Sequence, residues 1–420
     1  MTDTTQSGPL MAADGTPLKS RLAKAMRLSR MRAFGLVAPL LCFITAFFFL
    51  PIVVLLWQGI YNNQFAAGMP KTSELIADWD GQDLPGEEIY AALATDIVAA
   101  REIDRALPTK VGARLNREIS GALSLFKKTT RKVRKMEAPF KENLIKADKK
   151  WGEIDYWHAI KRVSSSYTMS FVLKALDLRI LDDGSIGWQP EKVQIHLKLF
   201  LRTLEISVVV TLATLVLGYP VAYLLSTLPV RTSNLLLILV LLPFWTSILV
   251  RTTSWIAILQ GQGALNDIFV WLGITTNDQR FSMIYNKLGT LIAMTHILLP
   301  FMVLPLYSVM KAIPPSYVRA AKSLGATNWT AFWRIYFPQT IPGIGAGGIL
   351  VFILAIGYYI TPALLGGQDG VMISNIIDTH MRSSLNYSLA AALGLVLLVF
   401  VLFLYWIYDR VVGIDNMKLG

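Results

Sequence analysis

The residues with the most informative types and spacing lie between positions 319 and 338. They are Arg319, Ala320 and Ala321, then Gly325 after three further residues, and then Ile335, Phe337 and Pro338. The pattern predicts a short helix, a turn in which Gly325 takes a positive φ, and a second helix that Pro338 ends. Pro314 and Pro315 suit the first turn of the first helix, where the missing N–H has no helical partner to lose. The small alanines leave one helix face flat, so the expected chemistry is docking on another protein.

Residue patterns that support catalysis do not occur in the sequence. It has no Gly-x4-Gly-Lys-Ser/Thr to hold nucleotide phosphates, no His-Glu-x2-His and no Gly-x-Ser-x-Gly. The four histidines are scattered, and we interpret His296, inside an apolar run, as a hydrogen-bonded packing residue and not as a proton relay. We therefore expect that the chain is not an enzyme and binds neither a metal nor a cofactor.

The composition indicates a membrane protein. Apolar residues make up 54% of the chain and charged residues only 16%, and the mean hydropathy is +0.48. Between 61 and 199 the 22 Lys and Arg are nearly balanced by 19 Asp and Glu, whereas the rest of the chain has 18 against 9, mostly at the ends of apolar segments. This is the positive-inside pattern and not a nucleic-acid-binding surface. The single cysteine, Cys42, excludes an intrachain disulfide.

Six apolar segments reach the ~20 residues that a helix needs to cross a bilayer. They run from 35 to 57, 201 to 225, 234 to 259, 288 to 310, 341 to 365 and 389 to 408. We expect a basic cytoplasmic tail (1–33), a first transmembrane helix (34–60), an insertion (61–199), a five-helix core (200–410) and a cytoplasmic tail (411–420). With the basic N-terminus inside, this count also places the loop 311–340 in the cytoplasm and the insertion in the periplasm.

The insertion has the apolar spacing of helices. Apolar residues recur every three or four positions at Ile89, Leu93, Ile97 and Ala100, and again at Val111, Leu115, Ile119, Ala122, Phe126, Val133 and Met136. A single apolar stripe needs a cover, so we expect a small helical subdomain. The basic cluster from Lys127 to Lys150 is typical of a solvated helix face, and the alternative is a contact for a partner or for lipid head groups.

The stretch from 319 to 338 resembles the EAA cytoplasmic loop of bacterial ABC importer permeases. In that family Glu-Ala-Ala is followed after three residues by Gly, and after nine more by Ile-x-Leu-Pro. This chain keeps every spacing but carries Arg319 in place of Glu and Phe337 in place of Leu. The resemblance implies an all-α membrane fold of six transmembrane helices and a loop that lies in a groove on a separate ATPase subunit.

Further blocks resemble the first permease subunit of the spermidine/putrescine transport family. They are residues 203–204 with 218–223, residues 242–252 with Trp255 and 263–266, residues 299–305, and residues 357–367. The resemblance covers about 200–420, and the insertion has no counterpart in it. It implies a permease subunit of an ATP-driven, binding-protein-dependent importer in the bacterial inner membrane. The same resemblance implies that the substrate is a polyamine.

The same resemblance implies the partners. They are a second permease chain, expected to be a paralogue, two ATPase subunits that bind ATP and magnesium, a periplasmic solute-binding protein and the lipid bilayer. Another small solute, such as an opine or an amino acid derivative, stays open as the substrate. A secondary transporter is less favoured, because it would show inverted repeats and would not need the Ala-Ala-x3-Gly loop.

A polyamine path needs carboxylates and aromatic faces, which replace the hydration of a di- or trivalent cation. Glu205 is the one acid within a predicted span, and Asp267 and Asp378 lie in outer loops. Arg251 would repel a cationic solute unless an acid neutralises it, and we expect Glu205 either to meet the solute or to pair with Arg202 or Arg251. The predicted path residues are Glu205, Tyr223, Trp245, Arg251, Trp255, Tyr358, Tyr359 and Asp378.

Overall fold

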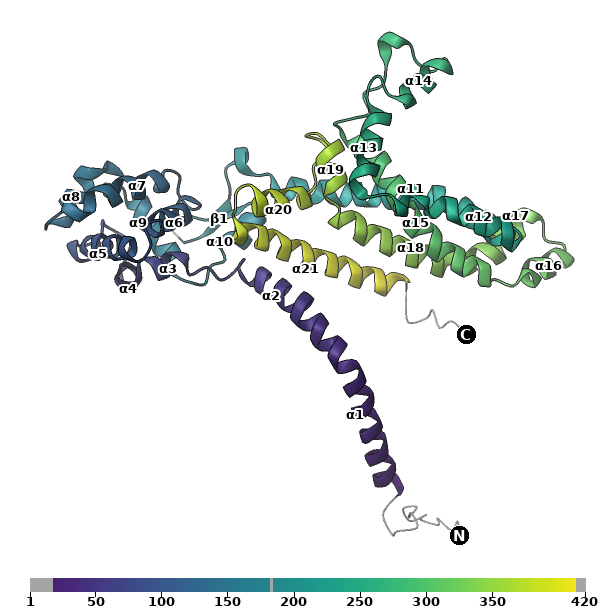
Figure 1. The fold of residues 1–420 in the computed structure, drawn as a ribbon, viewed down its shortest axis with the longest axis horizontal. Coiled ribbons are helices and arrows are strands. Elements are labelled where there is room, and N and C mark those ends of the chain that lie inside the picture. The colour runs from purple at the N-terminus through teal and green to yellow at the C-terminus, as the bar shows by residue number, and fades with distance from the viewer. Residues whose placement is uncertain (1–17, 182–183, 413–420) are drawn as a thin grey trace. The chain divides into compact units, whose positions relative to one another are not determined.

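The computed structural model describes residues 18–181 and 184–412 and is almost entirely helical (Figure 1). The chain forms two compact units, residues 1–57 and 58–420. In the first unit a helix runs through α1 (Leu18–Ile44), a π-helical turn η1 (Thr45–Phe49) and α2 (Leu50–Trp57). Its segment Ser29–Trp57 is long and apolar enough to cross a membrane, which confirms the first predicted span. The basic residues before the span already belong to the helix.

The membrane-spanning part of the second unit is built on α11 (His196–Thr227), α15 (Lys287–Ala312), α18 (Phe337–Gly357) and α21 (Tyr387–Val412). In the described residues five helices can cross a membrane, or six when one bent pair counts as a span. The core between α11, α15 and α18 contains Ile206, Val210, Met302, Leu306 and Val351, all fully buried. The second, fourth and sixth predicted spans are therefore confirmed.

The third predicted span is not one straight helix. The structure divides it into α12 (Val230–Leu241) with a 3-10 turn η5 (Leu242–Trp245), and α13 (Ile248–Leu259) followed by α14 (Ala264–Trp271). The two halves meet at an angle of 98°. Ser247 begins α13 as its N-cap, because its hydroxyl accepts the Val250 N–H at 3.2 Å.

The fifth predicted span, 341–365, is also interrupted. Helix α18 ends at Gly357, and a separate short helix, α19 (Ile360–Leu365), follows the non-helical pair Tyr358 and Tyr359. Pro362 explains the break, since it has no N–H to donate to the Tyr358 carbonyl and its ring would clash with that carbonyl in a continuous helix. Helix α20 (Ile373–Arg382) supplies donors at the break, since the Ser374 hydroxyl donates to the freed Tyr358 carbonyl at 2.7 Å. The Asn375 amide donates to the Tyr359 carbonyl at 2.7 Å, and that carbonyl also accepts the Ala363 N–H at 3.0 Å.

The insertion forms the expected helical subdomain. Its helices are α3 (Gln64–Gly68), α4 (Pro70–Ala77), α5 (Glu87–Ile103), α6 (Leu107–Asn116), α7 (Ala122–Lys132), η2 (Val133–Lys135), α8 (Phe140–Ala147), η3 (Lys149–Gly152), α9 (Ile154–Ser164), α10 (Ser170–Ala175) and η4 (Glu191–Val193). The predicted stripe residues Leu93, Ile97, Val111, Leu115 and Phe126 are fully buried in one core. The stripe from 111 to 136 belongs to three elements, α6, α7 and η2, and not to one helix. A two-stranded antiparallel hairpin, β1 (Leu178–Ile180) and β2 (Ile186–Trp188), departs from the all-helical expectation.

The insertion packs against one end of the bundle, where α11 and α21 begin. Helix α10 packs on α21, where Phe171 and Ala175 share a core with Leu389 and Leu393. Asp177 closes the start of α11, since its carboxylate accepts the N–H groups of His196 and Leu197 at 3.1 and 2.8 Å. Arg117 donates to the Leu385 carbonyl at 3.1 Å.

A buried ionic network stiffens the same junction. Glu118 pairs with Arg114 and with Lys174, each at 2.9 Å, and accepts from the Ser170 hydroxyl. Burial by itself would raise the pKa of Glu118, but Lys174 and Arg114 outweigh it and hold the pKa to about 2. Burial lowers the pKa of Lys174, although the neighbouring Glu118 carboxylate acts in the opposite direction.

Candidate coupling loop and translocation path

The loop between α15 and α18 begins with the predicted short helix. Helix α16 (Pro315–Ser323) has Pro315 in its first turn, and Gly325 follows with φ +90°. The Gly325 N–H donates to Lys322 O and the Ala326 N–H to Ala321 O, both at 3.0 Å. These two bonds form a Schellman motif, in which a residue of positive φ ends the helix and satisfies its last carbonyls. The predicted turn at Gly325 is confirmed.

The second half of the loop differs from the prediction. Pro338 does not end a helix; it lies in the first turn of α18. Helix α17 (Asn328–Ala331) runs through a π-helical segment, η7 (Phe332–Tyr336), into α18, with the Phe337 N–H donating to Phe332 O. Proline has no N–H to donate to a carbonyl of the preceding turn. The wider π-turn before Pro338 shifts the hydrogen bonds so that this N–H is not required, and the chain stays helical from the loop into the membrane span.

Aromatic rings fix this loop to helix α11. The Tyr223 ring lies 6.1 Å from that of Phe332 and 5.4 Å from that of Tyr336, and Tyr219 lies 5.9 Å from Phe337. The Tyr219 and Thr340 hydroxyls share a hydrogen bond at 3.2 Å. Movement of the loop would therefore be transmitted to α11 and α18. Tyr223, a predicted path residue, lies at this end of the bundle.

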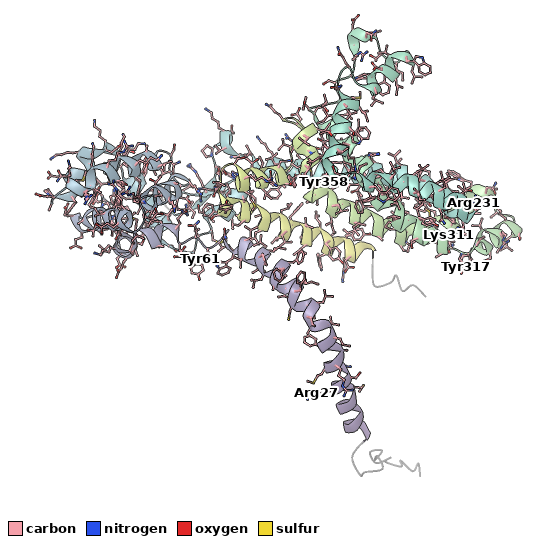
Figure 2. The ribbon with its side chains drawn as sticks, viewed as in Figure 1. Arg27, Tyr61, Arg231, Lys311, Tyr317 and Tyr358 are labelled. Atoms are coloured by element: carbon pink, nitrogen blue, oxygen red, sulfur yellow. The ribbon has the colours of Figure 1, made fainter. Side chains whose placement is uncertain are left out.

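The exposed side of the loop is basic and apolar. Leu324 is 90% exposed and Trp329 72% exposed, which is unusual for large apolar side chains unless a partner covers them. A cavity of about 850 Å³ lies beside α16 and is lined by Lys311, Arg319 and Lys322, among others. Figure 2 shows Lys311, Tyr317 and Arg231 at the same end of the bundle. Residues 311–340 contain no acid, so this surface is cationic throughout.

At the break in the third span, Arg251 supplies hydrogen bonds that the backbone lost. Its guanidinium donates to the carbonyls of Pro243 and Thr246, the latter at 3.0 Å, and to the Thr246 hydroxyl at 3.3 Å. Non-helical backbone at membrane depth requires such partners. The structure thus shows a role for Arg251 that the sequence did not predict. Trp245 lies beside the break and is 74% exposed.

The structure brings the two breaks together. Thr252 on α13 and Thr361 on α19 are both fully buried, and their hydroxyls lie 3.5 Å apart. Near them the Trp255 N–H donates to the Nδ1 of His296 at 3.2 Å, so His296 has the hydrogen bond that the sequence analysis expected. The predicted path residues Trp245, Arg251, Trp255, Tyr358 and Tyr359 therefore lie on two neighbouring interrupted spans.

Glu205 has a partner that the sequence analysis did not name. Its carboxylate pairs with Lys287, the first residue of α15, and with neither Arg202 nor Arg251. Arg202 instead donates to the Gln368 carbonyl at 2.8 Å. Glu205 lies at the start of the second predicted span and Lys287 just before the fourth. The predicted topology therefore places both residues at the same end of the bundle, which was a usable signal for their pairing.

The other two acids that the sequence analysis considered, Asp378 and Asp267, also form ion pairs. Asp378 binds Arg382 at 2.6 Å, and Arg382 donates to the Tyr359 hydroxyl at 3.2 Å. Asp267 binds Arg280 at 2.8 Å. The residues that sequence reasoning missed are thus cations, Lys287, Arg382 and Arg280, each of which neutralises a predicted acid.

Comparison with known proteins identifies the fold. A family model described as "Binding-protein-dependent transport system inner membrane component" matches residues 208–412. The spermidine/putrescine transport system permease protein PotB of Escherichia coli is 35% identical over 52% of this chain and 80% of its own length. PotB of Haemophilus influenzae is 34% identical over 52% of this chain and 75% of its own length. The chain belongs to this family of inner membrane transport permeases.

The permease is also similar to the inner membrane ABC transporter permease protein YdcU of Escherichia coli, at 32% identity over 47% of this chain and 66% of that protein. All of these relatives match only about half of this chain, and the matched family region begins at 208. The insertion therefore lies outside the part that the family model describes. The permease is a multi-pass inner membrane protein whose relatives are transport proteins and not enzymes.

Proposed function

We propose that this permease forms half of the transmembrane path of an ATP-driven importer of polyamines. The observation that carries the proposal is the identity of 34–35% to spermidine/putrescine permeases over 75–80% of their length. A second permease chain, a paralogue, completes the path, and a periplasmic solute-binding protein delivers the solute. Both termini and the loop 311–340 lie in the cytoplasm, and the insertion lies in the periplasm.

Two ATPase subunits, which bind ATP and magnesium, dock on this permease and on its paralogue. On this chain they meet the predicted coupling residues from Arg319 to Pro338. The exposed Leu324 and Trp329, the Schellman turn at Gly325 and the continuous helix from α17 into α18 support this role. Closure of the ATPase pair moves α16, and the aromatic contacts of Tyr223 and Tyr219 carry the movement to α11.

The direct test is uptake by the purified importer in proteoliposomes, with its solute-binding protein outside and ATP inside. We expect uptake of labelled spermidine or putrescine that requires ATP. Uptake of an opine or an amino acid without any polyamine uptake would overturn the substrate and keep the importer class. Uptake that ignores ATP and follows an ion gradient would overturn the importer class.

Glu205 tests where the cation enters the path. Glu205→Gln should weaken polyamine uptake without lowering assembly of the complex, because an exposed ion pair contributes only about 0.2–1 kcal/mol. Lys287→Gln is the matched control, since it breaks the same ion pair but keeps the carboxylate. Equal effects of the two variants on uptake, or loss of assembly in both, would show that Glu205 serves the ion pair and not the solute.

A further inference from the structure

The insertion carries its charge unevenly. Residues 101–150 contain 15 Lys and Arg against 6 Asp and Glu, whereas residues 61–100 contain 1 against 7. The positive charge is densest on α7 and η2, where six cations lie within nine residues without an acid. We call these six exposed residues the basic face: Lys127, Lys128, Arg131, Lys132, Arg134 and Lys135. Phe126, Thr129 and Val133 are buried on the opposite side of the same helix.

The fold does little to neutralise this face. Within the described residues only Lys128 has an ion-pair partner, Asp148 at 2.9 Å. The spacing places Lys127 four residues before Arg131, and Arg131 four before Lys135, so like charges face one another along the helix. Like charges at this spacing destabilise the helix, and residues that are present despite such a cost usually serve a function.

A cavity of about 380 Å³ adjoins the basic face, between α5 and α7. Arg101, Arg105 and Arg134 line it together with Glu102, and none of these four forms an ion pair with a described residue. The Arg101 guanidinium is already positioned, because it donates to the Thr130 carbonyl at 3.2 Å. Planar guanidinium groups bind carboxylates through two parallel hydrogen bonds, so three of them around one cavity suit an acidic side chain.

The position of the face favours a soluble partner over a membrane surface. Helix α10 of the insertion packs on α21, and Arg117 and Asp177 tie the insertion to the ends of α21 and α11. Helix α7 lies in the part of the insertion away from these contacts (Figure 1). The basic face is therefore held to the transport helices through α10 and lies away from the helix ends that enter the bilayer, which favours a soluble partner.

We propose that the basic face and its arginine cavity dock the acidic surface of the soluble solute-binding protein, with one Asp or Glu side chain in the cavity. This inference rests on the proposed function, since it needs a periplasmic insertion and a delivered cation. A protein that carries a di- or trivalent cation surrounds it with carboxylates, so its open side is acidic and complementary to the basic face. The insertion would thereby orient the carrier over the outer ends of α11 and α21.

The test uses the complete importer in nanodiscs and, as probe, the solute-binding protein that supports its uptake. Association and dissociation rates are measured at low and at physiological salt. Arg131→Glu with Lys135→Glu should slow association by about tenfold or more at low salt and flatten the salt dependence, because these residues steer the encounter. Arg105→Ala with Arg134→Ala should mainly speed dissociation, because these residues hold the bound carboxylate.

Lys71→Glu with Lys192→Glu is the charge-matched control, since both residues are exposed and lie on α4 and η4. Binding that is weakened in the first two variants and normal in the control supports the proposal. Unchanged binding in all three, with normal ATP-driven uptake, overturns the docking surface and leaves the proposed function intact. If uptake by the unaltered importer requires phosphatidylglycerol and uptake by the basic-face variants does not, the basic face binds lipid and the docking proposal is wrong. If the unaltered importer shows no ATP-driven uptake, the proposed function itself fails.

Discussion

The sharpest test of the coupling mechanism is the substitution Gly325→Val. Gly325 has φ +90° and ends α16 through the Schellman hydrogen bonds of its own N–H and of Ala326. No atom lies within 4 Å of the position that a Cβ would take, so the substitution creates no clash. Its whole effect acts through the backbone.

The size of that effect follows from the left-handed conformation. An L-residue at positive φ costs about 1–2 kcal/mol, and a β-branched side chain lies at the upper end of that range. This lowers the equilibrium ratio of native to non-native turn by roughly five- to thirtyfold. Because the loop sits at the surface, the protein should still insert and assemble while α16 and α17 lose their mutual orientation.

The assay compares ATP hydrolysis and polyamine uptake by the same proteoliposomes. We expect Gly325→Val to lower uptake by about the factor given by the turn population and to lower uptake per ATP hydrolysed. Gly325→Asn is the control, since asparagine tolerates positive φ, and it should retain most of the coupling. Full uptake by the valine variant, or equal damage from asparagine and valine, would refute the reasoning.

Three further predictions concern the topology and the two polar networks. Ser120→Cys in a Cys42→Ala background should react with a membrane-impermeant maleimide outside spheroplasts, because Ser120 is exposed on the insertion; labelling only after lysis would contradict the six-span topology. Glu118 has a folded pKa of about 2 against an ordinary 4.5, so its ionised form stabilises the fold above about pH 4.5 and loses up to ~3 kcal/mol as the pH falls toward 2. Glu118→Gln should flatten that part of an acid-unfolding curve followed by circular dichroism, and an unaltered curve would argue against the network. Arg251→Met should lower the thermal stability of the complex in detergent by the ~1–3 kcal/mol of unsatisfied carbonyls, with partial rescue by Arg251→Lys; an unchanged Tm would show that Arg251 does not hold the break.

Local patterns sufficed where local physics decides the outcome. The span lengths, the positive φ of Gly325 and the buried stripe of Leu93 and Ile97 follow from hydrophobicity, from the missing Cβ and from helical periodicity. The family resemblance also rests on residue types at fixed spacing, and the comparisons confirm it.

The helix breaks needed the tertiary structure. A chain can leave the helix at Tyr358 and at Thr246 only if donors reach the freed carbonyls, and those donors are Ser374 and Arg251. Likewise Pro338 ends a helix in isolation, yet here a π-turn before it lets the helix continue into the membrane. The Ser374 donor lies on another helix, 16 residues after the Tyr358 carbonyl, so a local sequence pattern does not pair the two groups.

The partners of the charged residues were decided in the same way. Glu205 was predicted either to meet the solute or to pair with Arg202 or Arg251, and folding placed Lys287 beside it, from a helix more than eighty positions further along the chain. The sequence by itself determined that this chain crosses the membrane, carries the Ala-Ala-x3-Gly loop and holds a helical insertion. Only the tertiary structure decided which charges neutralise one another and which, on the basic face of the insertion, have no ion-pair partner among the described residues, because ion pairing depends on distances of a few ångströms between elements remote in sequence.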